Sequence, residues 1–430
     1  MEQKSRLGNI NPKYNTIKLK EILTRDNSGE WGDDPDKEFI SVLRGTNFNN
    51  DGILNITDIA LRYLTAEQIK EKKLYENDII IERSGGSDTQ PVGRVGFIDK
   101  KIADINCSCA NFIQRISLID SINSKYIYYC LQQLYEMKQT TAMQAQTTGL
   151  RNLDWKMYKK TILPNPELKE QNAIAGIISK VDQCIENVQK TIDATQKLKK
   201  SLMQNLLTGR MKPDGTMRKD NEFYEHPKMG KIPVGWEVKK IKEVYNRKTD
   251  TIDPTKSKDV YPYLGLENIV PNEFRRIGNG FSNETAALKV IFNKGDLLYG
   301  KLRPYLNKVF ISDIDGVGST EFLVFEQNEY TNWLYFILQT TDFLNFTKSM
   351  TAGTQHPRVS WNDIKKRFIA IPEKDERDAI TYILNSLSDD NKRNKIEYLY
   401  RLKKSLMQNL LTGKKRVDVD KINSLLDSMK

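Results

Sequence analysis

The sequence contains no long hydrophobic run. None of its 430 residues lies in a stretch that approaches the ~20 consecutive apolar residues of a membrane-spanning helix. The first residues also lack the hydrophobic core of a signal peptide. We therefore expect a cytoplasmic protein with no membrane partner.

Metal-ligating and acid–base residues are scarce. The chain has only two histidines, His226 and His356, and four cysteines with no Cys-x-x-Cys pair. A structural zinc site needs four nitrogen or sulfur ligands in paired spacing, and catalysis by histidine is poorly supplied. The pattern predicts no metal site, and cysteines that are reduced and mostly buried.

Common catalytic motifs are absent as well. The sequence has no GxxxxGK[ST], GxGxxG, GxSxG or HExxH. Residues 11–14, Asn-Pro-Lys-Tyr, are similar to the Asn-Pro-Pro-Tyr box of adenine methyltransferases, but the third residue differs and no glycine-rich cofactor loop accompanies them. We predict a non-catalytic chain without a cofactor of its own. The alternative is an enzyme with an unrecognised site, for which the nearest candidates are Asp78, Glu82 and Arg83, or Asp296 and Lys301.

The charge is unbalanced. The chain has 67 Lys and Arg against 56 Asp and Glu, which gives a net charge of +11. Such a surplus favours a polyanionic partner. The length predicts about three domains.

An internal repeat is the most informative feature. Residues 198–209, LKKSLMQNLLTG, recur letter for letter at residues 402–413. Upstream, Pro-Glu-x-x-Glu-x-x-Ala-Ile occurs at 166–174 and again at 372–380. The offsets are 204 (402 − 198) and 206 (372 − 166), so two residues are missing from the second copy. Chance similarity does not explain twelve identities in a row.

Both copies have the pattern of long amphipathic helices. The first copy carries apolar residues in 4-3-4-3-4 spacing, which is a coiled-coil seam: Ile174, Ile178, Val181, Ile185, Val188 and Ile192. Residues 168–207 would form about 60 Å of helix. Gly209 and Gly413 follow the last apolar turns, where a C-terminal cap belongs. The second copy has Asn391 and Asn394 on its seam, as either buried register-fixing residues or an exposed polar face.

The divergent parts are predicted to be α+β. Residues 77–119 and 290–326 are rich in short β-branched runs broken by turns. Helical patterns follow at about 124–138 and 331–348. Residues 210–235 contain three prolines and many charges, which is typical of a linker.

This organisation resembles the specificity (S) subunit of Type I restriction–modification systems. The resemblance rests on the duplicated LKKSLMQNLLTG, on the two Pro-Glu-x-x-Glu helix starts and on GKIPVGWEV at 230–238, and it spans essentially the whole chain. It implies an α+β fold with two globular target-recognition domains, separated by two long antiparallel coiled-coil helices in a pseudo-two-fold repeat. The expected boundaries are target-recognition domains at 1–165 and 236–371, helical spacers at 166–209 and 372–413, a linker at 210–235 and a tail at 414–430.

The resemblance also implies a function. Each target-recognition domain would read one half of a split double-stranded DNA site. The helices would dock two methyltransferase (M) subunits, and restriction/translocase (R) subunits would join them. S-adenosylmethionine, ATP and Mg would belong to those partner subunits. Because the two domains differ, the DNA site should be asymmetric. A coiled-coil structural adaptor without DNA readout is the alternative, and an inactive or phase-switching variant of the family is another.

Candidate DNA-binding residues lie in polar turns at matching places of the two halves. Lys and Arg would contact phosphates, and bidentate Arg, Asn or Gln side chains would read base edges. Trp155 and Trp361, which follow the last such turn in each half, are predicted to be core anchors. The candidates are Arg44, Asn47, Arg83, Ser84, Gln144, Gln146, Thr148, Arg151, Asn152, Asn268, Lys301, Arg303, Tyr305, Lys308, Thr354, Gln355, His356 and Arg358.

The identical helical segments are assigned to a different role. Two copies of one partner protein explain their identity better than two different DNA half-sites do. We therefore predict that their leucines form the helix seam and the docking surface for the M subunit. These residues are Leu198, Leu202, Leu206, Leu402, Leu406 and Leu410.

Overall fold

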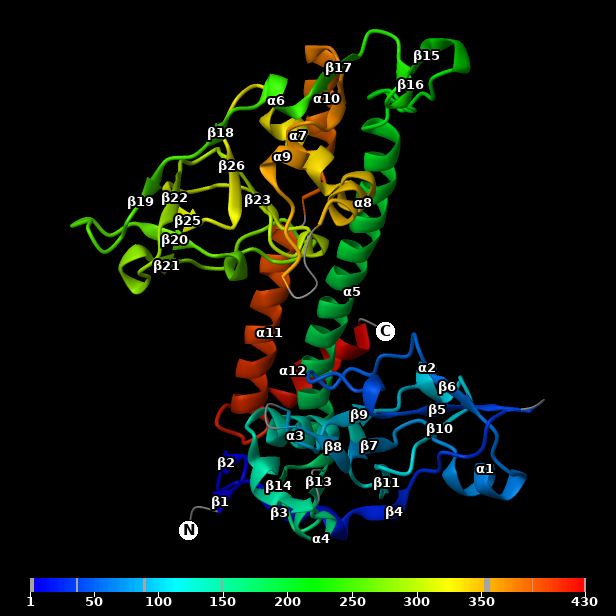
Figure 1. Ribbon diagram of the computed structural model, residues 1–430. Coiled ribbons are helices and arrows are strands. Elements are labelled where there is room, and N and C mark those ends of the chain that lie inside the picture. The colour runs from blue at the N-terminus through cyan, green and yellow to red at the C-terminus, as the bar shows by residue number, and fades with distance from the viewer. Residues whose placement is uncertain are drawn as a thin grey trace. The chain divides into compact units, whose positions relative to one another are not determined.

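The computed structural model describes residues 4–35, 38–87, 90–147, 150–351, 356–388 and 390–428 (Figure 1). The chain divides into two compact units, which we call the first unit (residues 1–190 and 392–430) and the second unit (residues 191–391). Each unit therefore contains part of both repeat copies. Among the described residues, no helix is both long and apolar enough to cross a bilayer.

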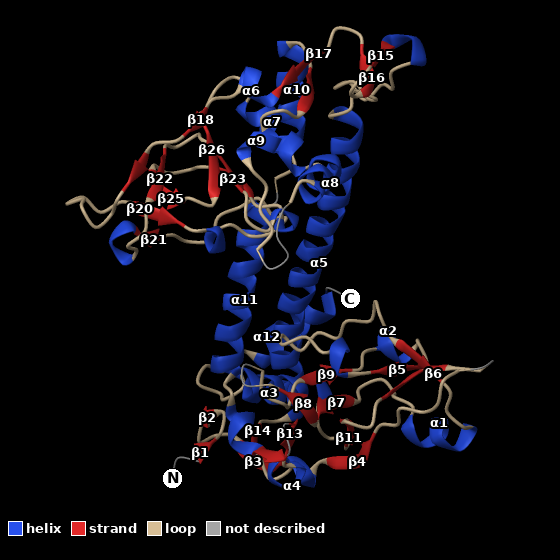
Figure 2. Ribbon diagram, viewed as in Figure 1, coloured by secondary structure: helices blue, strands red, loops and turns tan. Residues whose placement is uncertain are grey.

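Short strands and helices make up the first unit (Figure 2). Its strands are β1 Lys4–Ser5, β2 Gly8–Asn9, β3 Asn15–Lys18, β4 Leu23–Ser28, β5 Ile40–Leu43, β6 Ala60–Arg62, β7 Ile79–Glu82, β8 Ser84–Gly86, β9 Val95–Phe97, β10 Cys107–Cys109, β11 Ile113–Leu118, β12 Gln144–Thr147, β13 Leu150–Leu153 and β14 Ile162–Asn165. Its helices are α1 Ala66–Lys72, α2 Lys100–Ala103, α3 Ser124–Glu136, α4 Trp155–Tyr158, the first part of α5 Leu168–Leu206, most of α11 Asp390–Leu410, and α12 Val419–Ser428.

The second unit is built from the remaining elements. Its strands are β15 Phe223–His226, β16 Gly230–Pro233, β17 Glu237–Lys240, β18 Arg247–Lys248, β19 Thr251–Ile252, β20 Pro262–Leu264, β21 Gly280–Phe281, β22 Lys289–Phe292, β23 Leu297–Gly300, β24 Val309–Ile311, β25 Gly316–Ser319, β26 Phe322–Phe325 and β27 Phe368–Ile371. Its helices are the last part of α5, α6 Ile241–Val244, α7 Thr331–Gln339, α8 Thr341–Ser349, α9 Trp361–Ile364 and α10 Lys374–Ser386.

Three sheets have the same strand order in both units. The four-stranded sheet β4-β11-β7-β9 corresponds to β18-β26-β23-β24. The three-stranded sheet β10-β5-β6 corresponds to the β25-β20-β21 part of the five-stranded sheet β19-β22-β25-β20-β21. In the second pair of sheets, one contact is parallel in each unit, β5 with β10 and β20 with β25. The pair β3-β14 corresponds to β17-β27. The repeat thus extends through the parts whose sequences diverge, and the predicted α+β class is confirmed.

The helix seam is present in the first unit. Val181, Ile185 and Leu399 form a buried cluster, against which Val188, Leu402 and Leu406 pack. Further along α11, residues 407–411 pack beside Ile174 and Ile178 at the start of α5. Increasing numbers on one helix meet decreasing numbers on the other, so the two helices are antiparallel.

The second repeat copy differs from the first by an interruption. Helix α5 is continuous over 39 residues, whereas α10 ends at Ser386 and α11 begins at Asp390. The sequence there, Ser-Leu-Ser-Asp-Asp, favours a break because Ser and Asp side chains compete for backbone hydrogen bonds. Asn391 and Asn394 are both exposed, which supports the exposed polar face rather than buried register-fixing residues.

An equivalent contact in each unit joins the variable part to the helices. Glu170 accepts hydrogen bonds from the Tyr14 hydroxyl (2.8 Å) and from the Arg416 guanidinium (3.0 and 2.6 Å). In the second unit the matching Glu376 accepts from Trp236 Nε1 (3.1 Å) and from Arg218 (2.5 Å). The second glutamate of each Pro-Glu-x-x-Glu motif is therefore a structural anchor.

The Asn-Pro-Lys-Tyr segment takes part in the same contact. The backbone N–H of Asn11 donates to the Thr412 carbonyl (2.9 Å), and its side-chain Nδ2 donates to the Gly413 carbonyl (2.8 Å). Gly209 and Gly413 have φ values of +68° and +70°, as a left-handed C-terminal cap requires. These bonds give residues 11–14 a structural role at the end of the second helical copy.

The predicted linker and tail both contain secondary structure. Residues 210–235 include the β15–β16 hairpin, and Ile232 is buried in the core of the second unit. After Gly413, α12 lies along the beginning of α5, where the absence of a side chain at Gly176 leaves room for Leu426.

Candidate nucleic-acid interface

In the first unit, two of the predicted polar turns meet at the end of the central strand β7. The N–H of Arg83 donates to the Phe112 carbonyl (2.8 Å), and the Arg83 carbonyl accepts from the Leu153 N–H (2.8 Å). Strand β8 then pairs with β13, which pairs with β12. The structure thus gathers residues of both turns at one small sheet: Ser84, Gln144, Gln146, Arg151 and Asn152 lie on its strands, and Arg83 directly precedes β8.

Side chains at this sheet contact one another and the neighbouring elements β11 and α4. Ser84 and Asn152 are hydrogen-bonded, and Arg83 donates to the Gln114 Oε1 (2.9 Å). The Arg83 guanidinium also lies 5.9 Å from the centre of the Trp155 ring. The Nε2 of Gln144 is buried and finds no hydrogen-bond acceptor among the described residues. The side chain of Gln146 and all of Thr148 lie outside the described residues.

The corresponding site in the second unit has the same backbone frame. The N–H of Lys301, which follows β23, donates to the Glu321 carbonyl (2.9 Å), and the Lys301 carbonyl accepts from Val359 (3.1 Å). Leu302 bridges to Arg358, and the Arg303 N–H donates to the Pro357 carbonyl (2.8 Å). The two predicted turns of this half are therefore also adjacent.

The candidate side chains of this second site are more exposed than those of the first unit. Arg303 has a left-handed φ of +51°, and Tyr305 is 46% exposed. Arg358 is paired with Glu321 (3.1 Å), and His356 is exposed. Lys308 donates to the Leu266 carbonyl (2.5 Å), and desolvation lowers its pKa. Thr354 and Gln355 lie outside the described residues.

Asn47 and Asn268 have internal roles. Asn47 is 2% exposed; its Oδ1 accepts from the Arg44 N–H (2.8 Å) and its Nδ2 donates to the Asn55 and Asp58 carbonyls. Asn268 Oδ1 likewise accepts from the Gly265 N–H (2.8 Å), and its Nδ2 donates to the Ile277 carbonyl. These amides hold equivalent 3₁₀ turns, so we leave both out of the proposed interface. Arg44 lies beside Asn47 and is paired with Asp58 (2.7 Å).

Comparison with known proteins decides the family. The family model described as Type I restriction modification DNA specificity domain matches residues 11–196 and again residues 233–413. The chain belongs to this family. It is a Type I specificity subunit with two DNA specificity domains, as the repeat and the motifs predicted.

Relatives of this specificity subunit match half of its length or more. It is 24% identical to the Type I restriction enzyme MjaVIII specificity subunit of Methanocaldococcus jannaschii over 81% of each chain. It is 22% identical to the Type I restriction enzyme EcoDI specificity subunit of Escherichia coli over about half of each chain. The crystal structure of a Type I S subunit from M. genitalium superposes with a TM-score of 0.56 at 16% identity, covering 95% of this chain and 99% of that one. This last likeness supports the fold.

The leucines predicted for the seam and for M docking have mixed environments in the specificity subunit. Leu206 and Leu410 are buried, whereas Leu202, Leu402 and Leu406 pack at the edges of core clusters. Leu198 is 51% exposed. Trp155 and Trp361 pack against the cores of their units, which confirms that they are core anchors.

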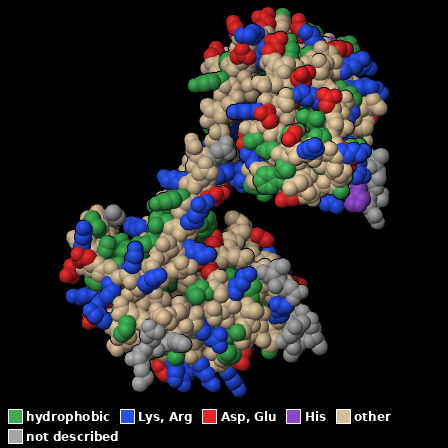
Figure 3. All heavy atoms as spheres, turned by 90° about the vertical axis from the view of Figure 1, so that its left-hand side faces the viewer, with side chains coloured by type: hydrophobic (Ala, Val, Ile, Leu, Met, Phe, Trp, Pro, Cys, Tyr) green, Lys and Arg blue, Asp and Glu red, His purple; other side chains and the backbone are tan. Residues whose placement is uncertain are grey.

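Charges on the specificity subunit are dispersed. On the face shown in Figure 3, Lys and Arg side chains are spread over each unit and interspersed with Asp and Glu rather than gathered into one continuous patch.

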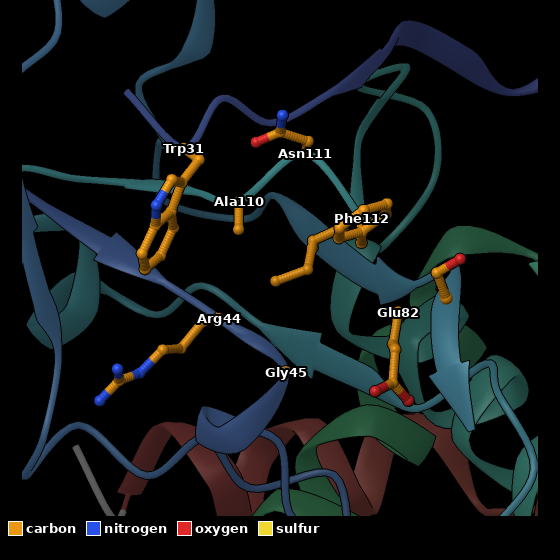
Figure 4. Close-up of a pocket in the computed structure, with 9 residues that line it drawn as sticks. Trp31, Arg44, Gly45, Glu82, Ala110, Asn111 and Phe112 are labelled. Atoms are coloured by element: carbon orange, nitrogen blue, oxygen red, sulfur yellow. The ribbon is translucent and has the colours of Figure 1, made fainter. Parts of the chain in front are cut away.

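A hollow of about 360 Å³ in the first unit is lined in part by two aromatic residues that the sequence did not predict as site residues, Trp31 and Phe112 (Figure 4). Phe112 is 65% exposed, a property that no sequence pattern signalled.

Proposed function

We propose that this specificity subunit reads a bipartite, asymmetric double-stranded DNA site, with one half-site read by each unit. The observation that carries the proposal is the matched backbone frame at Arg83 and Lys301, which bears different side chains in the two units. Equal frames would hold DNA-reading residues at equivalent positions, and different side chains would select different bases. The site should therefore lack the palindromic symmetry of a homodimer's operator.

The residues proposed to contact DNA are those gathered at these strand ends. In the first unit, Arg83 and Ser84 directly follow β7, with Arg83 hydrogen-bonded to Gln114 and Ser84 hydrogen-bonded to Asn152. In the second unit, exposed Arg303 and Arg358 flank the corresponding point. The proposed set is Arg44, Arg83, Ser84, Gln144, Arg151 and Asn152 in the first unit, and Lys301, Arg303, Tyr305, Lys308, His356 and Arg358 in the second.

The proposal also assigns the chemistry to partner subunits. Two M subunits would dock on the two copies of the identical helical segment, and R subunits would complete the assembly. S-adenosylmethionine, ATP and Mg would be bound by those partners, and this chain would act only in recognition and positioning. The absence of recognisable catalytic motifs from the sequence supports this division.

Mapping of methylated adenines tests the proposal. The chain is expressed with its neighbouring M subunit in a methylation-free host, and N6-methyladenine is mapped by single-molecule sequencing. We expect a split asymmetric motif that disappears when this chain is omitted. If both proteins are soluble and associated but no new motif appears, the proposed DNA reading is wrong and a structural adaptor is the better account.

A further inference from the structure

The turn that faces the proposed reading residues has opposite chemistry in the two units. Phe112 and Glu321 occupy equivalent positions, because the carbonyl of each accepts the backbone N–H of the residue that follows the central strand. Phe112 lies between β10 and β11, and Glu321 lies between the corresponding β25 and β26. The same point of the frame thus carries a phenyl ring in one unit and a carboxylate in the other.

The first unit presents an apolar surface at this point. Phe112 is 65% exposed at the edge of the hollow, and Trp31 and Ala110 form other parts of its wall (Figure 4). The Trp31 ring is held by the Arg62 guanidinium, 4.6 Å from the ring centre. The exposed phenyl ring shares the hollow with Arg44 and Ser84, two of the residues proposed to contact DNA, and is free to pack against a bound group.

The charges around the hollow do not repel DNA. Glu82 is the carboxylate in its wall, and both of its oxygens accept hydrogen bonds from Arg94, at 2.5 and 2.8 Å. Its negative charge is therefore neutralised, with the side chain only 4% exposed. Arg44 adds a guanidinium to the same hollow. Arg44 is itself paired with Asp58, so the hollow combines an apolar wall with charged side chains that each have an opposite charge beside them.

The second unit presents a polar surface instead. Glu321 is paired with the Arg358 guanidinium at 3.1 Å, and both side chains reach solvent. Such a pair suits hydrogen-bonding atoms of a base edge and offers no apolar wall. The two half-sites should therefore differ in apolar character at the base pair that this position faces.

We infer that Phe112 is a specificity-determining residue that packs against a thymine 5-methyl group in the first half-site. The methyl group is the one apolar feature on a base edge in the major groove, and Phe is among the side chains that contact it. The hollow between Phe112 and Trp31 has room for this methyl group. The inference rests on the proposed function, because it requires that the first unit reads DNA.

The test uses the complex of this chain with its M subunit and duplexes that carry its mapped motif. Each thymine of the first half-site is replaced in turn by uracil, which removes only the methyl group. We expect one replacement to weaken binding about fourfold, the effect of one buried methyl group. Phe112→Ala should weaken binding to the thymine duplex to a similar extent or more. On the uracil duplex, Phe112→Ala should weaken binding less than it does on the thymine duplex, because the methyl contact is already absent there.

Two further variants separate this contact from a general effect. Phe112→Leu keeps an apolar side chain and should retain the preference for thymine over uracil. Phe281→Ala removes a half-exposed phenyl ring from the second unit and should have equal effects on the two duplexes. Phe112→Ala with equal losses on both duplexes would overturn the inference, and a simultaneous loss of DNA bending would identify Phe112 as a wedge inserted between bases.

Failure of the inference is distinguishable from failure of the proposed function. If the wild-type complex binds its motif specifically and no uracil replacement weakens binding, only the role of Phe112 is wrong. If the wild-type complex shows no sequence preference, the proposed function itself is wrong.

Discussion

Lys403, in the identical helical segment, makes a buried ion pair whose loss has a predictable cost. Its Nζ lies 2.8 Å from Asp182 Oδ1, and the two side chains are 4% and 19% exposed. The same Asp182 accepts a hydrogen bond from the Tyr129 hydroxyl (2.6 Å). Burial and the neighbouring carboxylate raise the pKa of Tyr129, so the phenol remains a donor. Lys403→Met would leave the carboxylate with this neutral donor but without its counter-charge.

The magnitude follows from the burial of the pair. Removing one partner of a fully buried ion pair costs about 3–5 kcal/mol. Asp182 is partly exposed and keeps the bond from Tyr129, so we expect a loss of about 2–3 kcal/mol for Lys403→Met. Since 1.4 kcal/mol corresponds to a factor of ten, the population of the opened first unit should rise roughly 30- to 150-fold.

Hydrogen exchange measured by mass spectrometry is the appropriate assay, because a chain with two units need not unfold in one step. Amides of α3 and α11 should exchange faster in Lys403→Met by that factor. Lys404→Met alters an exposed neighbour and should change exchange little. Adding Asp182→Asn to Lys403→Met should recover part of the loss, because the uncompensated charge is gone. The reasoning is refuted if Lys403→Met and Lys404→Met behave alike.

Three further predictions concern thiols, a helix cap and half-site reading. At pH 8, a thiol reagent should modify one cysteine of the native chain, the exposed Cys184, because burial raises the pKa of the others to about 11 or 12; a second fast thiol would contradict this. Gly413→Ala should lower the melting temperature more than Gly215→Ala. Both glycines have a positive φ, but only a Cβ at position 413 would lie 2.7 Å from the Tyr14 ring. Equal shifts in melting temperature would show that packing at position 413 is unimportant. Arg358→Ala should relax only the second half-site of the methylation motif, and equal relaxation of both halves would remove Arg358 from the readers.

Local patterns in the sequence predicted the helices and their caps. The seam spacing identified Ile174, Ile178 and Ile185 as buried, and all three are. The letter-for-letter repeat predicted two equivalent helix ends, and Gly209 and Gly413 both adopt the left-handed cap. These features were readable because helix periodicity and capping depend on residues within a few positions of one another.

The tertiary structure decided what the polar residues do. Asn47 and Arg83 are both polar residues of predicted turns. The Asn47 amide, however, makes its hydrogen bonds to backbone groups of its own turn and of the residues that follow it. Lys403 and Lys404 are adjacent lysines of one motif, yet only Lys403 is buried on Asp182.

The sequence by itself determined the repeat, the family and the helical seam, because each of these is written in identities and spacings along the chain. Only the tertiary structure could show that Phe112 and Glu321 occupy equivalent positions with opposite chemistry. Their equivalence depends on hydrogen bonds to Arg83 and Lys301, between strands that lie far apart in sequence and are aligned by the pairing of the sheets. Side-chain exposure at such a turn is set by neighbours from several strands, which no local pattern encodes.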